Sequence, residues 1–364
     1  MTTPYLTADQ TSLFSPMPLK RGPTINNRFV LAPMTTTQSA ADGSVLPAEY
    51  DWLVARAQGG FGLITTCASH VLPNGQGFPG QLGCFSDDLI DGLRQLASGI
   101  KTAGGVSSLQ LHHAGIRAFA GVSDKVGPSS DDKTGARALE AEEIAFVIEA
   151  FVAAARRAER AGFDGVQVHG GHGYLITQFL SPELNRRSDG WGGSLANRAR
   201  LLLEIVRGIR EACGPDFQLG VRISPERFGL RLSEMLKVAT MLYASDIDYL
   251  DLSIWDVTKE AEEEQYRGQT LASHFIALDR GSTRLGLAGK LMGGRQAFEC
   301  LAMGADYAAI GKAGIVAHDL PQQVAQDPDF TATLPVTREQ LAAQNVGTAF
   351  VEYLQGFNGI VSEG

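Results

Sequence analysis

The sequence predicts an α/β fold, a (β/α)8 TIM barrel with extended loops after the strands. Eight short apolar runs recur along the chain, and each run is followed by a longer segment with helical periodicity. Strands that alternate with helices pair in parallel, and eight such units close into a barrel. The chain has 364 residues, 44% hydrophobic and 20% charged, so it can bury the large core that a barrel requires.

The predicted strands are short apolar stretches that lie between helical segments. In chain order they cover residues 29–34, 62–66, 107–112, 165–169, 218–223, 249–253, 284–289 and 307–311. The predicted helices between them cover residues 47–58, 87–103, 140–161, 194–212, 232–244, 270–280 and 295–303. Ser194 is a good N-cap for the fourth of these helices. Gly162 and Gly304 mark the ends of the third and the seventh.

Two more helices are predicted after the last strand, at residues 319–326 and 338–354. We expect a single domain over residues 1–364, with the barrel proper at about 25–330 and a C-terminal helix and tail at about 335–364. Loop insertions explain why the chain exceeds the ~250 residues of a typical barrel. The tail carries four large apolar side chains that are candidates for contact with a second copy in a homo-oligomer, namely Phe350, Tyr353, Phe357 and Ile360.

The charge and the cysteine pattern exclude several classes of function. A net charge of -9 argues against nucleic acid and anionic membrane as partners, because both attract basic surfaces. No run reaches 18 apolar residues, and the first 14 residues lack the basic cluster and apolar core of a signal peptide, so we expect a cytoplasmic protein. The four cysteines form no C-x-x-C pair, which excludes an iron-sulfur cluster or a zinc ribbon.

The most informative segment follows the fourth predicted strand. His169 and His172 stand three residues apart where the strand gives way to a glycine-rich loop, and Tyr174 follows. Two imidazoles can donate hydrogen bonds to one oxygen, and a phenol nearby can supply a proton. This set can polarise a carbonyl and protonate a neighbouring carbon. A zinc site is the weaker alternative because no glutamate accompanies the pair on a helix, and a pair of core histidines bonded to backbone stays open.

Other polar residues lie at the carboxyl ends of the predicted strands, where barrel chemistry takes place. They are Thr35, Gln110, His112, His113, Arg222, Lys290 and Lys312.

Taken together, these segments resemble the old yellow enzyme family of flavin-dependent ene-reductases. The matching pieces are residues 27–35 (NRFVLAPMT), Gln110-Leu111 with His113-Ala114-Gly115, the loop 169–182, residues 187–198 (RSDGWGGSLANR) and Val221-Arg222. Their order covers nearly the whole chain. Thr35 is typical of one branch of that family, whereas the His-x-x-His form is closer to the other, so the chain is a hybrid.

The resemblance implies FMN as cofactor and assigns residues to it. Ala32, Pro33, Met34 and Thr35 match the segment along the flavin, and Ala68 matches a further backbone contact. Gln110 matches the residue at the pyrimidine edge, and Arg222 the cation near N1, where a charged fork suits the anionic reduced flavin. Gly289, Gly311 and Lys312 match the phosphate site. Lys312 replaces the usual arginine, so we expect weaker binding of the FMN phosphate.

The resemblance also implies a reaction. NADH or NADPH reduces the flavin, and an α,β-unsaturated carbonyl or nitro compound is then reduced in the same site, with no metal. His169 and His172 hold the substrate oxygen, and Tyr174 protonates the α-carbon after hydride reaches the β-carbon. Thr37 and His112 are further substrate-binding candidates, although a packing role for His112 is favoured because single histidines are more often packed.

Two alternatives of other classes remain. A phosphate-binding barrel lyase or isomerase would use a lysine imine, for which Lys290 is the candidate. A flavin-binding protein without turnover would hold FMN but consume no NAD(P)H.

A group of polar residues at positions 186, 187, 189, 197 and 198 is expected to order the loop after the fourth strand. The acidic run at 260–264 is expected to be a solvated surface loop.

Overall fold

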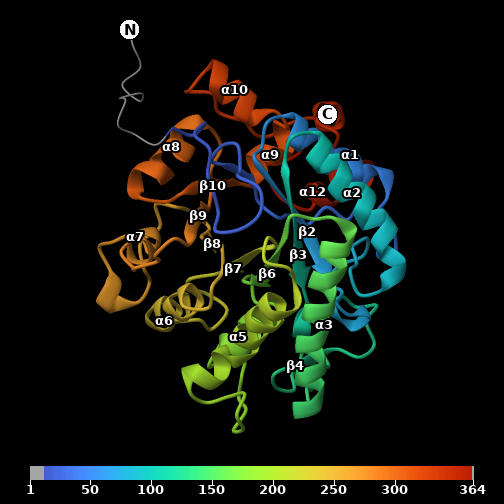
Figure 1. Cartoon of the computed structure of the whole chain (residues 1–364), viewed down its shortest axis with the longest axis vertical. Helices are drawn as coiled ribbons and strands as arrows, with labels where there is room; N and C mark the ends of the chain where they lie inside the picture. The colour runs from blue at the N-terminus through green and yellow to red at the C-terminus, as the bar shows by residue number, and fades with distance from the viewer. Residues whose placement is uncertain (1–11, 363–364) are drawn as a thin grey trace.

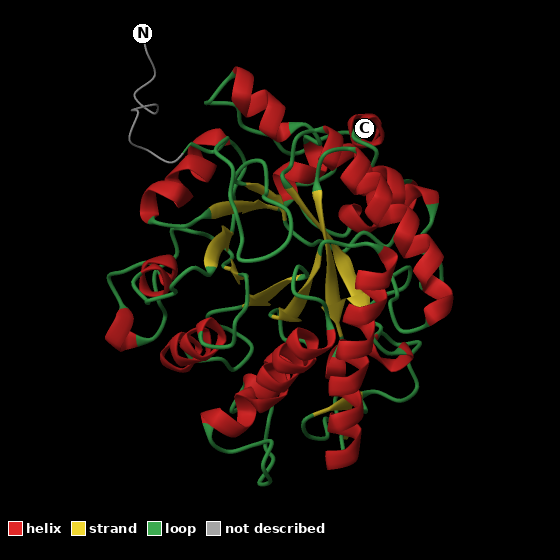
Figure 2. Ribbon diagram, viewed as in Figure 1, coloured by secondary structure: helices red, strands yellow, loops and turns green. Residues whose placement is uncertain are grey.

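A computed structural model describes residues 12–362 and confirms the predicted barrel. Eight parallel strands close in the order β1-β10-β9-β8-β7-β6-β3-β2. They lie at the centre of the molecule, and the helices surround them (Figures 1 and 2). The strands are β1 (Phe29–Leu31), β2 (Leu63–His70), β3 (Val106–His112), β6 (Gly165–Gly170), β7 (Gln218–Ile223), β8 (Tyr249–Ser253), β9 (Arg284–Ala288) and β10 (Tyr307–Ile310).

The helices that cover the barrel follow the predicted segments closely. They are α1 (Pro47–Gln58), α2 (Ile90–Thr102), α3 (Ala141–Ala161), α5 (Leu195–Ala212), α6 (Leu232–Tyr243), α7 (Leu271–Ile276), α8 (Gly294–Met303) and α10 (Leu320–Gln326). The Ser194 hydroxyl caps α5 by accepting a hydrogen bond from the Asn197 amide at 3.3 Å. Gly162 and Gly304 end α3 and α8 with φ of 88° and 112°, in the left-handed region that favours glycine.

The prediction of one helix at residues 338–354 was wrong. The segment forms α11 (Arg338–Ala343) and α12 (Thr348–Gln355), because Asn345 takes a φ of 56° and breaks the helical hydrogen-bonding pattern. The Gly347 amide then donates to Gln38 Oε1 at 2.7 Å, which fixes the new direction of the chain.

The helix predicted at 270–280 was also too long. The sequence analysis missed α4 (Leu175–Leu180), α9 (Lys312–Val316) and the short pair β4 (Val126–Gly127) and β5 (Arg137–Ala138).

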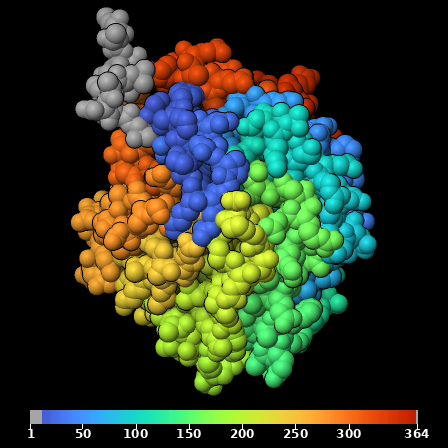
Figure 3. Space-filling view, viewed as in Figure 1, coloured from blue at the N-terminus to red at the C-terminus, as the bar shows by residue number. Residues whose placement is uncertain are grey.

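The segment before β1 covers the amino-terminal ends of the strands. Met17 and Ile25 pair as an antiparallel bridge, and both are fully buried. Arg21 forms an ion pair with Asp248 at 3.3 Å, just before β8. In the space-filling view this N-terminal segment lies across the middle of the visible face (Figure 3). One end of the barrel is therefore covered, which leaves the carboxyl ends of the strands for ligands. Residues 1–11, which carry most of the segment searched for a signal peptide, lie outside the described residues.

Two tyrosines fill the barrel interior in places where the facing strand has a glycine. Tyr249 packs on Gly220, and Tyr307 packs on Gly286, so tightly that an added Cβ would lie 2.1 Å and 1.9 Å from the respective ring. The Tyr249 hydroxyl also lies 3.1 Å from Ser108 Oγ. These rings form a solid floor below the site.

Helix α12 packs on α1 through aromatic side chains, and α11 contacts α12 and α9. Phe350 of α12 stacks on Trp52 with ring centroids 5.7 Å apart, and the Arg56 guanidinium lies 3.6 Å from the Trp52 ring. Arg56 is fully buried and donates only to backbone carbonyls, including Gln344 O at 2.7 Å and Gly314 O at 3.0 Å. Of the apolar residues of the tail, Phe350 and Ile360 are buried in this chain, whereas Phe357 is 45% exposed.

Within residues 12–362, no helix combines the length and the apolar character that crossing a membrane requires.

Gly286→Ala should destabilise the barrel floor. The new methyl group would overlap the Tyr307 ring, and overpacking of this kind costs about 1–3 kcal/mol. Urea unfolding at equilibrium measures the change. Gly190→Ala is the matched control, because Gly190 is exposed and a Cβ there would meet only the flexible end of Arg200 at 3.3 Å. Equal stability of the two variants would contradict the role given to Gly286.

Candidate active site

The loop after β6 presents His169, His172 and Tyr174 at the barrel mouth. His169 lies near the end of the strand, and Tyr174 is the N-cap residue of α4. His172 between them has a φ of 60°, a left-handed conformation that costs a non-glycine residue about 1–3 kcal/mol. The structure holds it there, since the His172 amide donates to Ser224 Oγ at 3.0 Å and Arg117 donates to the His172 carbonyl.

Three imidazoles and one phenol form a single cluster, in which His169 contacts the other three rings and His112 of β3 contacts two. The His112 ring centroid lies 5.5 Å from that of His169 and 4.4 Å from that of Tyr174. His169 and His172 meet edge to face at 5.0 Å, and His169 lies 5.5 Å from Tyr174. The structure therefore brings together the three predicted catalytic candidates and adds His112 to them.

Several ring nitrogens of this cluster lack a hydrogen-bond partner among residues 12–362. Both nitrogens of His112 and Nδ1 of His169 are buried without a hydrogen bond. Only His172 is held through its ring, with Nε2 2.6 Å from Ser253 Oγ. Buried polar atoms are rarely left unpaired unless the site serves a function. Neither His169 nor His172 has a ring hydrogen bond to backbone among residues 12–362, so the alternative of a pair of core histidines bonded to backbone has no support, and the cluster offers donors and acceptors to a ligand.

The imidazoles of the cluster are neutral near neutral pH. Burial lowers the pKa of His169 and His112 well below the usual value, and the neighbouring imidazoles lower it further. Burial, with the nearby Arg222 and Arg117 charges, lowers the pKa of His172 to about 3. Each neutral ring offers one N–H donor. Burial also raises the pKa of Tyr174, so its hydroxyl keeps the proton, although Arg117 opposes this effect.

Beside the imidazoles, strand register assembles a row of buried polar side chains. Gln110 of β3 pairs with Gln167 of β6, and Arg222 of β7 pairs with His169 on one side and Asp251 of β8 on the other. Gln110 Nε2 donates to Gln167 Oε1 at 2.7 Å, and Gln167 Nε2 donates to Asp251 Oδ2 at 3.4 Å. Arg222 Nε lies 3.5 Å from the same carboxylate oxygen. The row thus takes one residue from each of four neighbouring strands, β3, β6, β7 and β8.

Arg222 is held at three points. Besides Asp251, it donates to Ser253 Oγ at 3.1 Å and to the Pro33 carbonyl at 3.4 Å. Its side chain is only 6% exposed, so the guanidinium charge acts in a poorly solvated place. Burial raises the pKa of Asp251, and Arg222 opposes that rise. The arrangement places a fixed cation beside the predicted flavin segment.

The segment after β1 lies along this row. Ala32 is buried, whereas Pro33, Met34 and Thr35 are partly exposed and so remain accessible to a ligand. Ala68 lies at a register shift in β2, and its carbonyl accepts from Gln81 Nε2 at 2.7 Å.

Thr37 makes a contact that the sequence did not suggest. Its hydroxyl lies 3.1 Å from the Ala349 carbonyl of α12, and its φ is 57°. Instead of simply facing a pocket, Thr37 joins the loop after β1 to the C-terminal helix. The contact therefore brings α12, which also carries Tyr353, to the loop that follows β1.

The predicted phosphate residues lie just after β9 and β10: Gly289 follows β9, Gly311 is the N-cap residue of α9, and Lys312 is the first residue of that helix. Gly311 has open space, since an added Cβ would meet only Met34 Sδ at 3.9 Å. Lys312 begins α9, is exposed, and has no ion pair among residues 12–362. Gly289 has another reason to be glycine, because a Cβ there would lie 2.0 Å from the Ile254 carbonyl. Close packing against the loop after β8 thus requires Gly289.

Several residues of this site were missed at first, namely Arg117, Gln167, Ser224, Asp251 and Ser253. Gln167 and Asp251 carried a signal, because strands of a parallel barrel are usually apolar throughout and a polar side chain within one needs a partner. Ser253 is the last residue of β8, where the strand-end rule applies. Arg117 ends a short 3-10 helix after β3 and Ser224 directly follows β7, and no pattern in the sequence marks their contacts.

The polar residues of the long loop after β6 order it as predicted. Arg187 binds Asp189 at 2.6 Å, and Arg198 binds Glu234. Asn197 donates to the Gly192 carbonyl at 2.9 Å. The acidic run at 260–264 is mostly exposed, and within residues 12–362 no cluster of three potential metal ligands occurs.

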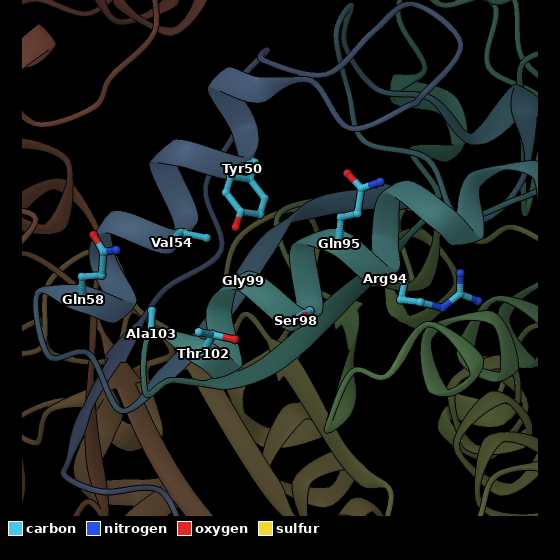
Figure 4. Close-up of a pocket in the computed structure, with 9 residues that line it drawn as sticks. All are labelled: Tyr50, Val54, Gln58, Arg94, Gln95, Ser98, Gly99, Thr102 and Ala103. Atoms are coloured by element: carbon cyan, nitrogen blue, oxygen red, sulfur yellow. The ribbon is translucent and has the colours of Figure 1, made fainter.

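One groove lies outside this site, between α1 and α2 on the helical layer. Tyr50 of α1 reaches towards α2 there (Figure 4). Gly99 is required at that point, because a Cβ would lie 2.6 Å from the Tyr50 ring. The groove is lined by residues of α1, of α2 and of the turn after α2, and it holds none of the residues discussed above.

Comparison with known proteins agrees with this geometry. Residues 12–327 match the model of the NADH:flavin oxidoreductase / NADH oxidase family. A probable NADH-dependent flavin oxidoreductase of Bacillus subtilis is 35% identical over 346 residues, which is 90% of this chain and 89% of that protein. An NADPH dehydrogenase of Bacillus pumilus is 36% identical over 301 residues, covering 80% of this chain and 87% of that protein.

Solved structures show the same architecture. The old yellow enzyme homologue from Zymomonas mobilis superposes with a TM-score of 0.79 at 28% identity, over 91% of this chain and 96% of that one. Morphinone reductase superposes with a TM-score of 0.76 at 26% identity, over 92% of this chain and 94% of that one. The fold and the site thus define a flavin-dependent NAD(P)H oxidoreductase. The chain belongs to the NADH:flavin oxidoreductase family, the family of old yellow enzyme.

The buried imidazoles should make the protein less stable in mild acid. Five histidines have a lowered pKa through burial: 70, 112, 113, 169 and 172. Between about pH 7 and pH 5 the unfolded chain binds protons at these residues and the folded protein does not, so the free energy of unfolding falls as the pH falls. The raised pKa values of Glu49 and Asp251 increase the free energy of unfolding as the pH falls. Because only these two carboxyl groups oppose the five histidines, we expect the effect of the histidines to be larger.

Urea unfolding at several pH values measures this dependence. We expect a net loss of at least about 1.4 kcal/mol per pH unit, the value for one imidazole, below about pH 6. A free energy of unfolding that stays constant or rises towards pH 5 would show that the imidazoles are protonated in the folded protein.

Proposed function

We propose that this chain is an FMN-dependent ene-reductase, which reduces the activated C=C bond of α,β-unsaturated carbonyl or nitro compounds with NADH or NADPH. The observation that carries the proposal is the cluster of neutral imidazoles with unpartnered nitrogens beside Tyr174. It adjoins the row that contains Gln110 and Arg222, because strand register pairs His169 with Arg222, in a chain of the flavin oxidoreductase family.

The residues present fit FMN. Gln110 at the end of its row offers an amide, and Arg222 offers a fixed guanidinium whose planar fork suits an anionic ring edge. The partly exposed residues after β1 give the ring system a surface to lie on, and Gly311 leaves space for close approach to its backbone. We assign FMN to Ala32, Pro33, Met34, Thr35, Ala68, Gln110, Arg222, Gly289, Gly311 and Lys312.

When bound, FMN supplies the hydride, which comes from NADH or NADPH. His169 and His172 bind and orient the second substrate by its carbonyl or nitro oxygen. Each neutral ring donates one N–H to that oxygen as negative charge develops there. Donors of this kind are worth about 3–4 kcal/mol each in known enzymes. The bond between Ser253 Oγ and His172 Nε2 fixes the orientation of one of these rings.

Tyr174 supplies the proton for the α-carbon. Its raised pKa keeps the hydroxyl protonated at neutral pH, and Arg117, 4.9 Å from the ring centroid, stabilises the phenolate that forms when the proton leaves. His112 meets the Tyr174 ring edge to face and has two free nitrogens, so it lines the same substrate site, with Thr37 at its outer edge.

The lyase alternative has little support in the site. A nucleophilic lysine needs a desolvated environment that lowers its pKa. The Lys290 side chain is 73% exposed and forms an ion pair with Asp256 at 2.9 Å. It therefore has the surroundings of an ordinary surface lysine.

An absorbance spectrum and anaerobic reduction test the proposed function. We expect the purified protein to be yellow with bound FMN, to be bleached by NADH or NADPH, and to regain its colour when an enone is added. A colourless protein that FMN does not reconstitute would refute the proposal. Binding of FMN without consumption of NAD(P)H would favour a flavin-binding protein instead.

Tyr174→Phe should slow the reduction of the alkene and leave the reduction of the flavin intact. Loss of a general acid lowers rates by about 100- to 10,000-fold. Stopped-flow absorbance separates the two half-reactions. Tyr353→Phe is the matched control, since Tyr353 is a neighbouring tyrosine on α12 with no assigned chemistry. A Tyr174→Phe variant with an unchanged second half-reaction would remove Tyr174 from the mechanism.

A further inference from the structure

One tryptophan of this chain lies open to water at the barrel mouth. Trp52 and Trp191 are 1% and 8% exposed, but Trp255 is 59% exposed. It follows β8 by two residues, so it lies just beyond Ser253, which holds the ring of His172. A single exposed aromatic residue is not by itself unusual. Its position at the carboxyl end of a barrel strand places it where ligands bind.

Arg227 makes a platform with this ring. Its guanidinium carbon lies 4.6 Å from the Trp255 ring centroid, in a cation-π contact between the loops after β7 and β8. Arg227 is exposed and forms no ion pair among the described residues. The acidic groups nearby form their ion pairs with lysines, since Lys259 binds Glu262 and Lys290 binds Asp256, and Arg227 makes only a minor contribution to the lowered pKa of Glu262. The charge of Arg227 is therefore available to an anion.

The loop that carries Arg227 is held in a strained conformation. Arg227 and Phe228 have φ of 72° and 57°, and Gly229 follows with 74°. Two successive non-glycine residues in the left-handed region persist only when the surroundings impose them, and such residues cluster at binding sites. The Leu230 amide closes this turn by donating to the Arg227 carbonyl at 2.9 Å. The turn presents the guanidinium towards Trp255.

The platform is continuous with the candidate active site. The Arg117 guanidinium lies 4.9 Å from the Tyr174 ring centroid and 5.8 Å from the Phe228 ring centroid. Gly173 leaves space for Phe228, because a Cβ there would lie 2.7 Å from that ring. Aromatic rings and guanidinium groups thus alternate from Tyr174 outward to Trp255.

We infer that Trp255 and Arg227 form a subsite for the adenosine phosphate end of NADH or NADPH. The inference rests on the proposed function, in which the nicotinamide end reacts at the barrel mouth. An aromatic face stacks with adenine, and a guanidinium fork binds phosphate oxygens. The phosphate is either the diphosphate bridge or the 2′-phosphate of NADPH, and the binding experiment below distinguishes them.

Two kinds of hydride donor, with and without the adenosine end, test this subsite in the variants Trp255→Ala and Arg227→Ala. NADH and NADPH carry the adenosine end, whereas N-benzyl-dihydronicotinamide lacks it. We expect Kd for the dinucleotides, from stopped-flow reduction of the flavin, to rise about tenfold in each variant. Kd for N-benzyl-dihydronicotinamide should change by less than about twofold. Phe146→Ala is the control, because Phe146 is 57% exposed on α3 and should affect neither donor.

Calorimetry with ADP-ribose and its 2′-phosphorylated form gives a second readout without turnover. We expect unmodified holoprotein to bind at least one of them and both variants to bind about tenfold more weakly. A loss in Arg227→Ala confined to the phosphorylated form assigns Arg227 to the 2′-phosphate, and an equal loss assigns it to the diphosphate. Unchanged dinucleotide binding, or equal losses for N-benzyl-dihydronicotinamide, would overturn the subsite. Failure of the unmodified protein to oxidise either donor would overturn the proposed function itself.

Discussion

A row of buried polar side chains across the top of the barrel is the constraint on which the site depends. Gln110, Gln167, Asp251 and Arg222 contact one another because strand register places them side by side. A buried cation would be strongly unfavourable without its carboxylate, and Asp251 would be unfavourable without the cation. The row therefore holds Arg222 in one place, and Ser253 joins that place to His172.

Burial then determines the chemistry that the imidazoles can perform. Because the pKa values of His169, His172 and His112 lie far below the usual value, the rings act as neutral donors. A neutral donor can stabilise a developing oxyanion without adding a second fixed cation close to Arg222. Tyr174 retains its proton for the same physical reason, so a single cause, removal of water, prepares both the oxyanion donors and the acid.

The sequence predicted the barrel and the loop after β6 because both leave periodic or clustered signals. Eight apolar runs marked the strands, and the pair of histidines near glycines marked the site. Contacts between distant segments left no such signal. The break at Asn345, the bond of Thr37 to α12 and the place of Arg117 beside Tyr174 all depend on how loops meet in space. Asp251 and Gln167 could have been found as polar residues within apolar strands, but their partners could not.

The reduction potential of the bound flavin in Arg222→Gln tests the central claim most directly. If Arg222 is the fixed cation beside the pyrimidine edge, it stabilises the anionic reduced flavin more than the oxidised form. Its removal should lower the potential by at least about 30 mV, which corresponds to a tenfold change for a two-electron couple. A potential equal to that of the unmodified protein would contradict the account, because the row would then have no electrostatic effect on the flavin.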